Sequence, residues 1–216
     1  MKIKSILILA AFILIPILVF SGSPPGPGGQ NLTKDPDVGG IVTITTDHYQ
    51  VHVGNAFQTH YEFTTAATDD LQTAIYLKTP TDKEIHMVAS FSVSAAGEFF
   101  ICEDVTIDAN EGTSAAVYNR NRNSLNTSTV FDNATVPVVN KVTTWTPSQM
   151  TSGNFTCGTE IEHEPLVAAA VPKQAGGNAE RGEIILKKNT EYLFMDQNIG
   201  ANANVHHIWL RWYEIE

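Results

Sequence analysis

The sequence predicts an all-β fold, an antiparallel β-sandwich of jelly-roll type, after an N-terminal hydrophobic segment. Apolar and polar residues alternate with a period of two in many short segments after residue 40, which is typical of strands with one buried face. No segment after residue 24 carries the sustained apolar stripe of a helix. About ten short strands at irregular spacing favour a two-layer antiparallel sandwich.

The chain begins with a charged and then strongly apolar segment. Lys2 and Lys4 precede about 15 apolar residues that only Pro16 interrupts, and small residues follow from Ser21, as in a secretory signal. A helix of that length covers roughly 22 Å, which is short for a bilayer core. We therefore expect residues 1–21 to be a cleaved signal peptide or a retained membrane anchor, and the body of the protein to be extracellular or surface-displayed.

Residues 22–40 are rich in proline and glycine. Six glycines and four prolines leave few large apolar side chains to bury, so this segment is predicted to be a tether that does not fold alone. Residues 41–216 have a usual length for one β-sandwich domain with a real core.

Ten segments of this domain are predicted to be strands. The fourth alternates around Met87 and Phe91, and the last places Leu210 and Trp212 on one face, so each has one side that faces the core. Clusters of turn residues separate the segments. In chain order they are residues 41–53, 57–63, 71–77, 84–93, 98–104, 138–146, 166–171, 183–187, 191–196 and 207–213.

The charge of the chain limits the classes of partner. The formal net charge of -10 becomes -12 if Lys2 and Lys4 are removed with the signal. Nucleic acid is a poor partner for such a chain, because phosphate binding needs clustered lysine and arginine. An acidic surface favours solubility and attracts cations.

Two features fit an exported protein. Cys102 and Cys157 would meet an oxidising compartment, where they either form a disulfide that stabilises the fold by about 4 kcal/mol or remain buried free thiols. Four asparagines precede a residue and then serine or threonine, which makes them glycosylation candidates: Asn31, Asn126, Asn133 and Asn154.

The sequence assigns no catalytic residue and no cofactor. It contains no Gly-rich phosphate loop, no nucleophile elbow and no paired-cysteine zinc motif. The two facing carboxylates of a glycosidase cannot be paired from sequence alone. A pocket that gathers two acids, or a histidine and an acid, would be needed to keep the enzyme class open.

Metal sites are expected to be absent, with calcium as the one alternative. His48 and His52 would share a metal on a helix, but in a strand four residues span about 13 Å and the rings cannot meet. The segment with Asp104, Asp108 and Glu111 is either a calcium loop or a solvated loop, and it lacks the regular spacing of known calcium loops.

Tryptophans and a polar run are the candidate contact residues. Trp209 and Trp212 lie on opposite faces of one strand, so at least one belongs to the core and the other is available to stack on a sugar. Long loops are predicted at 119–135 and 149–164. The first is either a hydrogen-bonded loop or an intersubunit contact. Its interface candidates are Asn119, Arg120, Asn121, Arg122 and Asn123.

Several short motifs of the chain together resemble those of a known family. They are His48-x-x-x-His52-x-Gly54, Thr79-Pro80, Glu103-Asp104, the run 119–130, the segment 181–192 and Trp212-Tyr213-Glu214. The family consists of small β-rich structural proteins of tailed phages and environmental viruses, of the head-decoration type, and the resemblance implies a non-catalytic structural role in a virion. Members of that family begin directly in the folded part, whereas this chain is expected to begin with an export signal and a tether.

These observations favour a non-enzymatic structural or display protein that self-associates or decorates a particle surface. Its partners would be copies of itself, a capsid protein or a surface protein. One alternative is an exported filament subunit in which Ile41, Val42 and Ile44 donate a strand to a neighbour. Another is a secreted module that binds carbohydrate or a receptor.

Overall fold

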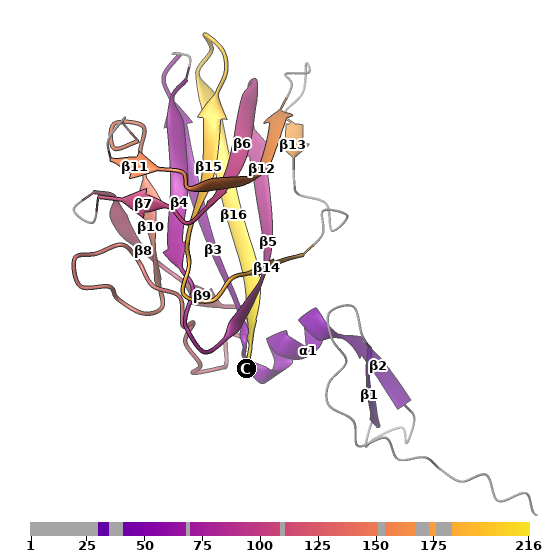
Figure 1. Cartoon of the computed structure of the whole chain (residues 1–216). Helices are drawn as coiled ribbons and strands as arrows, with labels where there is room; N and C mark the ends of the chain where they lie inside the picture. Colours follow the sequence, from indigo (N-terminus) through magenta and orange to yellow (C-terminus); the bar gives the residue numbers. More distant parts are fainter. Residues whose placement is uncertain are drawn as a thin grey trace, which may run out of the picture.

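The computed structural model describes residues 30–34, 41–67, 70–108, 111–150, 154–166, 173–175 and 183–216. These residues form antiparallel sheets and one short helix, which confirms the predicted all-β sandwich (Figure 1). The hydrophobic start, residues 1–21, lies outside the described residues. Among the described residues, no helix has the length and hydrophobicity to cross a membrane.

The elements follow one another from a hairpin through the helix into the sandwich. In chain order they are β1 (Gln30–Lys34), β2 (Ile41–Thr45), α1 (Thr46–Val53), β3 (Ala56–Thr65), β4 (Gln72–Lys78), β5 (Glu84–Val93), β6 (Gly97–Glu103), β7 (Thr106–Ile107), β8 (Thr113–Ala116), β9 (Tyr118–Asn119), β10 (Lys141–Trp145), β11 (Phe155–Thr156), β12 (Thr159–Leu166), β13 (Lys173–Ala175), β14 (Ile184–Leu186), β15 (Glu191–Asn198) and β16 (Asn204–Ile215).

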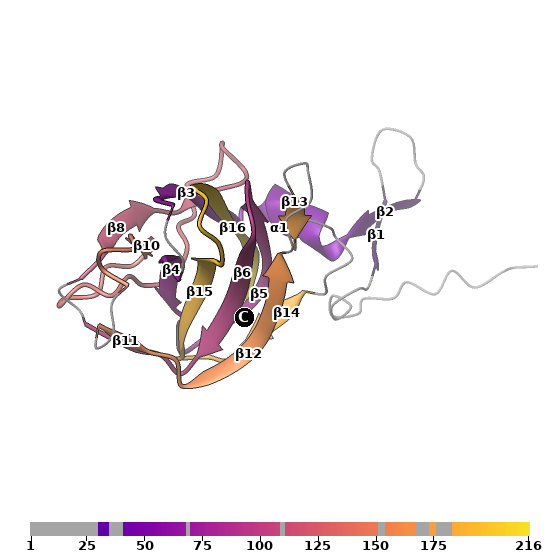
Figure 2. The ribbon, with the colours of Figure 1, turned by 90° about the horizontal axis from the view of Figure 1, so that it is seen from above.

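Two sheets form the layers of the sandwich (Figure 2). The first, sheet I, has the order β13-β5-β16-β3-β9, with β14 also paired to β5; the second, sheet II, has the order β12-β6-β15-β4-β10-β8. The pairs are nested: β3 with β16, β4 with β15, β5 with β13 and β14, and β6 with β12. A long antiparallel ribbon rolled up on itself gives this pattern, which is the jelly roll.

The main core lies between the sheets and follows the predicted alternation. On β16, Ile208, Leu210 and Trp212 are buried, whereas Trp209 is 48% exposed on the opposite face. Each fully buried large apolar side chain stabilises the fold by about 1.5–3 kcal/mol. A second apolar cluster contains Trp145, Leu193 and Cys102, together with partly buried residues of β7 and β11.

Residues 41–53 were predicted to form one strand, and this prediction is wrong beyond Thr45. Thr45 caps α1 by accepting the backbone N–H of His48 at 3.4 Å, and Asp47 stands in the first turn. Gly54 ends the helix with φ 80° and donates its N–H to Gln50 and Val51 carbonyls. The two caps decide the local structure, although the residues between them alternate in polarity as a strand would.

The tether prediction also needs correction. Residues 30–34, inside the interval 22–40, form β1, which pairs antiparallel with β2 from Gln30↔Thr45 to Lys34↔Ile41. The hairpin stands beyond α1, away from both sheets (Figures 1 and 2). The rest of the interval lies outside the described residues.

The loop predicted at 149–164 contains two strands instead. β12 is an edge strand that carries Glu160, Glu162 and Glu164, so it has no apolar face from which a strand is recognised. Charged residues on an edge strand also prevent unwanted pairing with other chains. Of the predicted strand 166–171, only Leu166 is in a strand, and residues 167–171 lie outside the described part.

Candidate functional site

The polar run, residues 119–130, begins in β9 and contacts the C-terminal end of α1. The side-chain amide of Asn119 donates to the Gly54 carbonyl at 2.7 Å, and that of Asn121 donates to the His52 carbonyl at 3.0 Å. Asn126 donates to the Val53 carbonyl at 3.3 Å. These amides satisfy carbonyls that a helix end leaves without intrahelical partners. The polar run therefore stabilises the C-terminal end of α1 in the same chain.

Arginines of the run were predicted to dock on a neighbour's acidic patch, and for Arg120 the structure shows a different partner. Its Nη1 lies 2.7 Å from Asp47 Oδ1 in α1 of the same chain. Arg122 lies over the ring of Tyr118, 5.6 Å from the centroid. Asn123 donates its backbone N–H to the side chain of Asn121. The intersubunit role of these residues remains a prediction.

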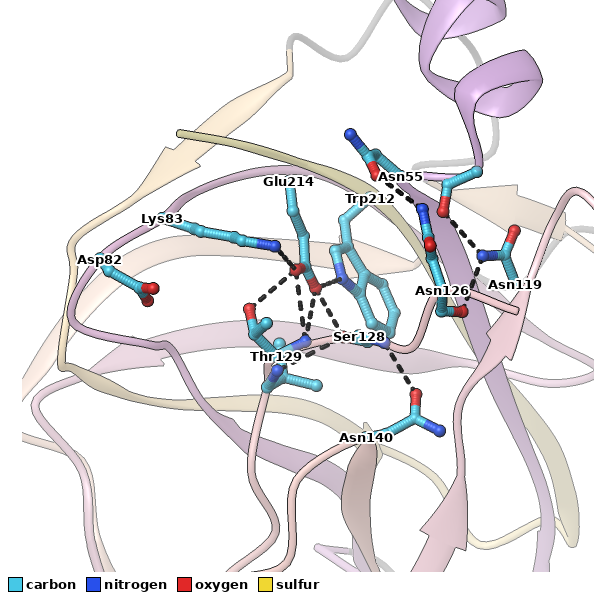
Figure 3. A network of polar contacts seen from close by, with 12 residues as sticks. Asn55, Asp82, Lys83, Asn119, Asn126, Ser128, Thr129, Asn140, Trp212 and Glu214 are labelled. Atoms are coloured by element: carbon cyan, nitrogen blue, oxygen red, sulfur yellow. Dashed lines mark hydrogen bonds and ion pairs between the residues drawn. The ribbon is translucent and has the colours of Figure 1, made fainter. Parts of the chain in front are cut away.

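Glu214 fixes the other end of the run (Figure 3). Its carboxylate is 1% exposed and accepts from the Ser128 hydroxyl at 2.6 Å and from the Thr129 hydroxyl at 2.7 Å. It also accepts from the backbone N–H of Thr129 at 2.9 Å and from Trp212 Nε1 at 3.3 Å. Lys83 Nζ lies 3.6 Å away. One buried charge thus ties the C-terminal strand to the polar run.

A cavity of about 270 Å³ lies where α1, β5 and β16 meet. His86 is buried there; its Nδ1 lies 2.6 Å from Glu183 Oε1, and the Tyr213 hydroxyl donates to Glu183 Oε2 at 2.7 Å. Burial and the bond to Glu183 raise the pKa of Tyr213. Arg211 also lines the cavity, and its buried Nε has no hydrogen-bond partner among the described residues.

Sequence reasoning missed this cavity. Arg211 and Tyr213 belong to the outer face of the last predicted strand, so their shared face was readable from the alternation. His86 and Glu183 come together because β14 pairs with β5, with Ile185 opposite His86. No local pattern in the sequence predicts the pairing of β14 with β5.

His48 and His52 were predicted to lie in a strand, with their rings too far apart to share a metal ion, and the structure places them in a helix instead. Since residues 46–53 are helical, His48 and His52 lie on one face, and their Nε2 atoms are 2.8 Å apart. The argument that kept the rings apart assumed a strand, and it fails. Among the described residues no group of three or more His, Cys, Asp or Glu side chains is placed to hold a metal ion.

The calcium alternative gains no support from the described residues. The backbone carbonyls of Asp108 and Glu111 accept the side-chain amide of Asn133 at 3.1 and 3.0 Å. Two backbone oxygens of this segment thus bind the chain's own amide, and the calcium site stays a prediction. Asp104 is in the left-handed region, with φ 56°.

The same contacts correct one glycosylation candidate. Asn133 is 7% exposed and its amide nitrogen makes both hydrogen bonds, so a glycan has no room there. Asn126 is exposed, and Asn154 donates its amide to the Gln149 carbonyl. The side chain of Asn31 lies outside the described part. Glycosylation at these three positions stays a prediction.

The two cysteines are bonded to each other. Cys102 in β6 and Cys157 after β11 form a disulfide with a Cα–Cα distance of 5.4 Å. Cys102 is buried beside Leu193 and Val105. The bond therefore fixes the segment between β11 and β12 against sheet II, and the free-thiol alternative does not hold.

Comparisons with known proteins give no relative. No protein-family model, no curated protein and no solved structure matches the chain. The resemblance to phage structural proteins therefore remains a prediction.

Proposed function

We propose that this chain is a non-enzymatic structural or display protein whose copies associate by donating the β2 segment to a neighbouring sandwich. The observation that carries the proposal is the separation between the β1–β2 hairpin and the sandwich (Figure 1). A two-stranded hairpin alone is marginally stable in water, and it gains most by adding to another sheet. Ile41, Val42 and Ile44 supply apolar residues for that contact.

The edge of β3 is the proposed acceptor. On that side β3 pairs only with β9, at Phe57 and Gln58. From Tyr61 onward its backbone pairs with no described strand there, and the Thr59 hydroxyl donates to the Ala116 carbonyl of β8 at 3.2 Å. Tyr61 and Phe63 are half-buried near this edge, with ring centroids 6.2 Å apart. They share a spacing of two with Val42 and Ile44, as strand addition requires.

The β12 edge of sheet II is less suited to accept a strand than the β3 edge of sheet I. β12 presents three glutamates and Pro165, features that discourage pairing with another chain. Donation of β2 to the β3 edge of the next copy would make the association directional, head to tail. Such contacts give rings or filaments according to whether the rotation closes.

Phe63→Lys tests the acceptor edge. A lysine at this half-buried position would charge the contact with the donated strand, so the variant is expected to be monomeric where the wild-type chain forms larger assemblies. Light scattering after size-exclusion chromatography measures the mass. Thr64→Lys is the matched control, because Thr64 is exposed on the other face of β3. Equal assembly of both variants would contradict the proposed edge.

A non-enzymatic role is supported by the motif-poor sequence. The cavity does gather His86 with Glu183, the combination that keeps the enzyme class open. Glu183 is shared with the Tyr213 hydroxyl, and no serine, threonine or cysteine lines the cavity among the described residues. Serine, threonine and cysteine are frequent nucleophiles, but carboxylates, histidine and tyrosine also serve, so the cavity keeps the enzyme class open.

Display outside the cell or on a particle fits the export signal expected from residues 1–21. Jelly rolls occur in viral capsids and in lectins, so the fold is compatible with virion decoration and with ligand binding and does not choose between them.

Carbohydrate binding is the second candidate, and one observation favours it. Trp209 is 48% exposed on the outer face of sheet I, two residues from Arg211, which lines the cavity and whose Nε has no hydrogen-bond partner in the described part of the chain. An exposed aromatic ring beside polar groups is suited to a sugar. If this candidate holds, Trp209→Ala abolishes binding on a glycan array, whereas Phe63→Lys leaves it unchanged. An array without signal for the wild-type chain removes the candidate.

A further inference from the structure

Helix α1 brings two imidazoles together in a geometry that suits a metal ion. His48 and His52 are both exposed, their ring centroids are 4.6 Å apart, and their Nε2 atoms are 2.8 Å apart. Both rings belong to one helix and are four residues apart, so their relation is set by the helix backbone.

The helix that carries the pair is fixed at both ends. Thr45 caps its start, and the Gly54 carbonyl accepts the amide of Asn119 at its end. An alanine at position 54 would collide with the side chain of Ser124 and adopt an unfavourable φ of 80°. The ion pair between Arg120 and Asp47 adds a third attachment. The backbone positions of the two histidines are therefore held in place before any ligand binds.

The nitrogen separation is the length of a hydrogen bond between the two rings, and it shows that both Nε2 atoms can approach one point. Two metal–imidazole bonds of about 2.0–2.1 Å to nitrogens 2.8 Å apart enclose an angle of roughly 85–90° at the metal. A tetrahedral ion would need nitrogens about 3.3 Å apart with the same bond lengths. Angles near 90° belong to the square-planar and tetragonal sites of Cu²⁺ and Ni²⁺.

We propose that His48 and His52 bind one Cu²⁺ or Ni²⁺ ion through their two Nε2 atoms, with water in the remaining positions. In the metal-free pair one ring donates its Nε2–H to the other, so that ring must carry its proton on Nδ1 in the complex. The Irving–Williams order then places Cu²⁺ above Ni²⁺ in affinity. Strand donation and metal binding are independent properties, because the pair lies on α1 and outside the β3 edge.

Calorimetric titration of the full chain with Cu²⁺, Ni²⁺ and Zn²⁺ tests the proposal. One Cu²⁺ per chain is expected, with Zn²⁺ bound at least tenfold more weakly because Cu²⁺ stands above Zn²⁺ in the Irving–Williams order. His48→Ala and His52→Ala are each expected to weaken Cu²⁺ binding by at least about tenfold, since each removes one arm of the chelate. His207→Ala is the control, because His207 is an exposed histidine beside Glu62 on sheet I.

Electron paramagnetic resonance of the Cu²⁺ complex provides a readout that folding defects do not mimic. The wild-type spectrum should show a tetragonal ion coupled to two imidazole nitrogens, and each single variant should lose one of them. Unchanged Cu²⁺ affinity in either variant, an equal loss in His207→Ala, or Zn²⁺ affinity equal to that of Cu²⁺ would overturn the proposal. The mass of the assemblies, measured on the same samples, reports separately on strand donation.

Discussion

Glu214→Gln is expected to lower the free energy of unfolding by about 3–5 kcal/mol, because it removes a buried charge that four donor groups share. The hydroxyls of Ser128 and Thr129 and the Thr129 backbone N–H all point at this carboxylate. An amide offers one oxygen in place of two and turns an N–H₂ group towards those donors. Lys83 also loses its counter-charge.

Urea denaturation followed by tryptophan fluorescence measures this loss. Trp212 donates to Glu214, so its fluorescence reports directly on the affected site. Glu216→Gln is the matched control, since Glu216 is exposed two residues further along the chain. A shift below about 1 kcal/mol in Glu214→Gln, the value of a typical neutral hydrogen bond, would mean that the network does not hold the polar run in place.

Loss of the disulfide is expected to have the second large effect. The bond spans 55 residues of sequence, and a loop of that length constrains the unfolded chain by about 4 kcal/mol in the chain-entropy description. Cys102→Ala with Cys157→Ala should lower the free energy of unfolding by about that amount.

Reduction of the wild-type protein provides the comparison for the double variant. Urea midpoints with and without a thiol reductant should differ for the wild-type chain and coincide for the double variant. Equal midpoints for oxidised and reduced wild-type protein would contradict a stabilising role for the bond.

The strands with one buried face could be predicted from the sequence because successive side chains of a strand point to opposite faces of the sheet. Apolar residues on the buried face therefore recur with a period of two. β5 and β16 follow that period, and their inward residues Met87, Phe91, Leu210 and Trp212 are buried. β12 was missed because its inner face carries the half-buried Glu162 and Glu164 in place of apolar residues, so the sequence shows no apolar period there.

The helix and the cavity were missed for different physical reasons. α1 depends on the caps at Thr45 and Gly54, two single residues that a search for apolar periodicity does not weigh. The cavity depends on the pairing of β14 with β5, which brings Glu183 to His86 across 97 residues of sequence. The polar run was noticed correctly as unusual, but its contacts with α1 needed the fold.

Light scattering of the chain from residue 22, compared with a chain that begins at Thr45, tests strand donation most directly. The shorter chain keeps the helix cap and the whole sandwich but lacks β1 and nearly all of β2. Assemblies of several copies from the longer chain and a folded monomer from the shorter chain are the predicted result. Equal masses for the two chains, whether both assemble or both remain monomeric, would contradict the account.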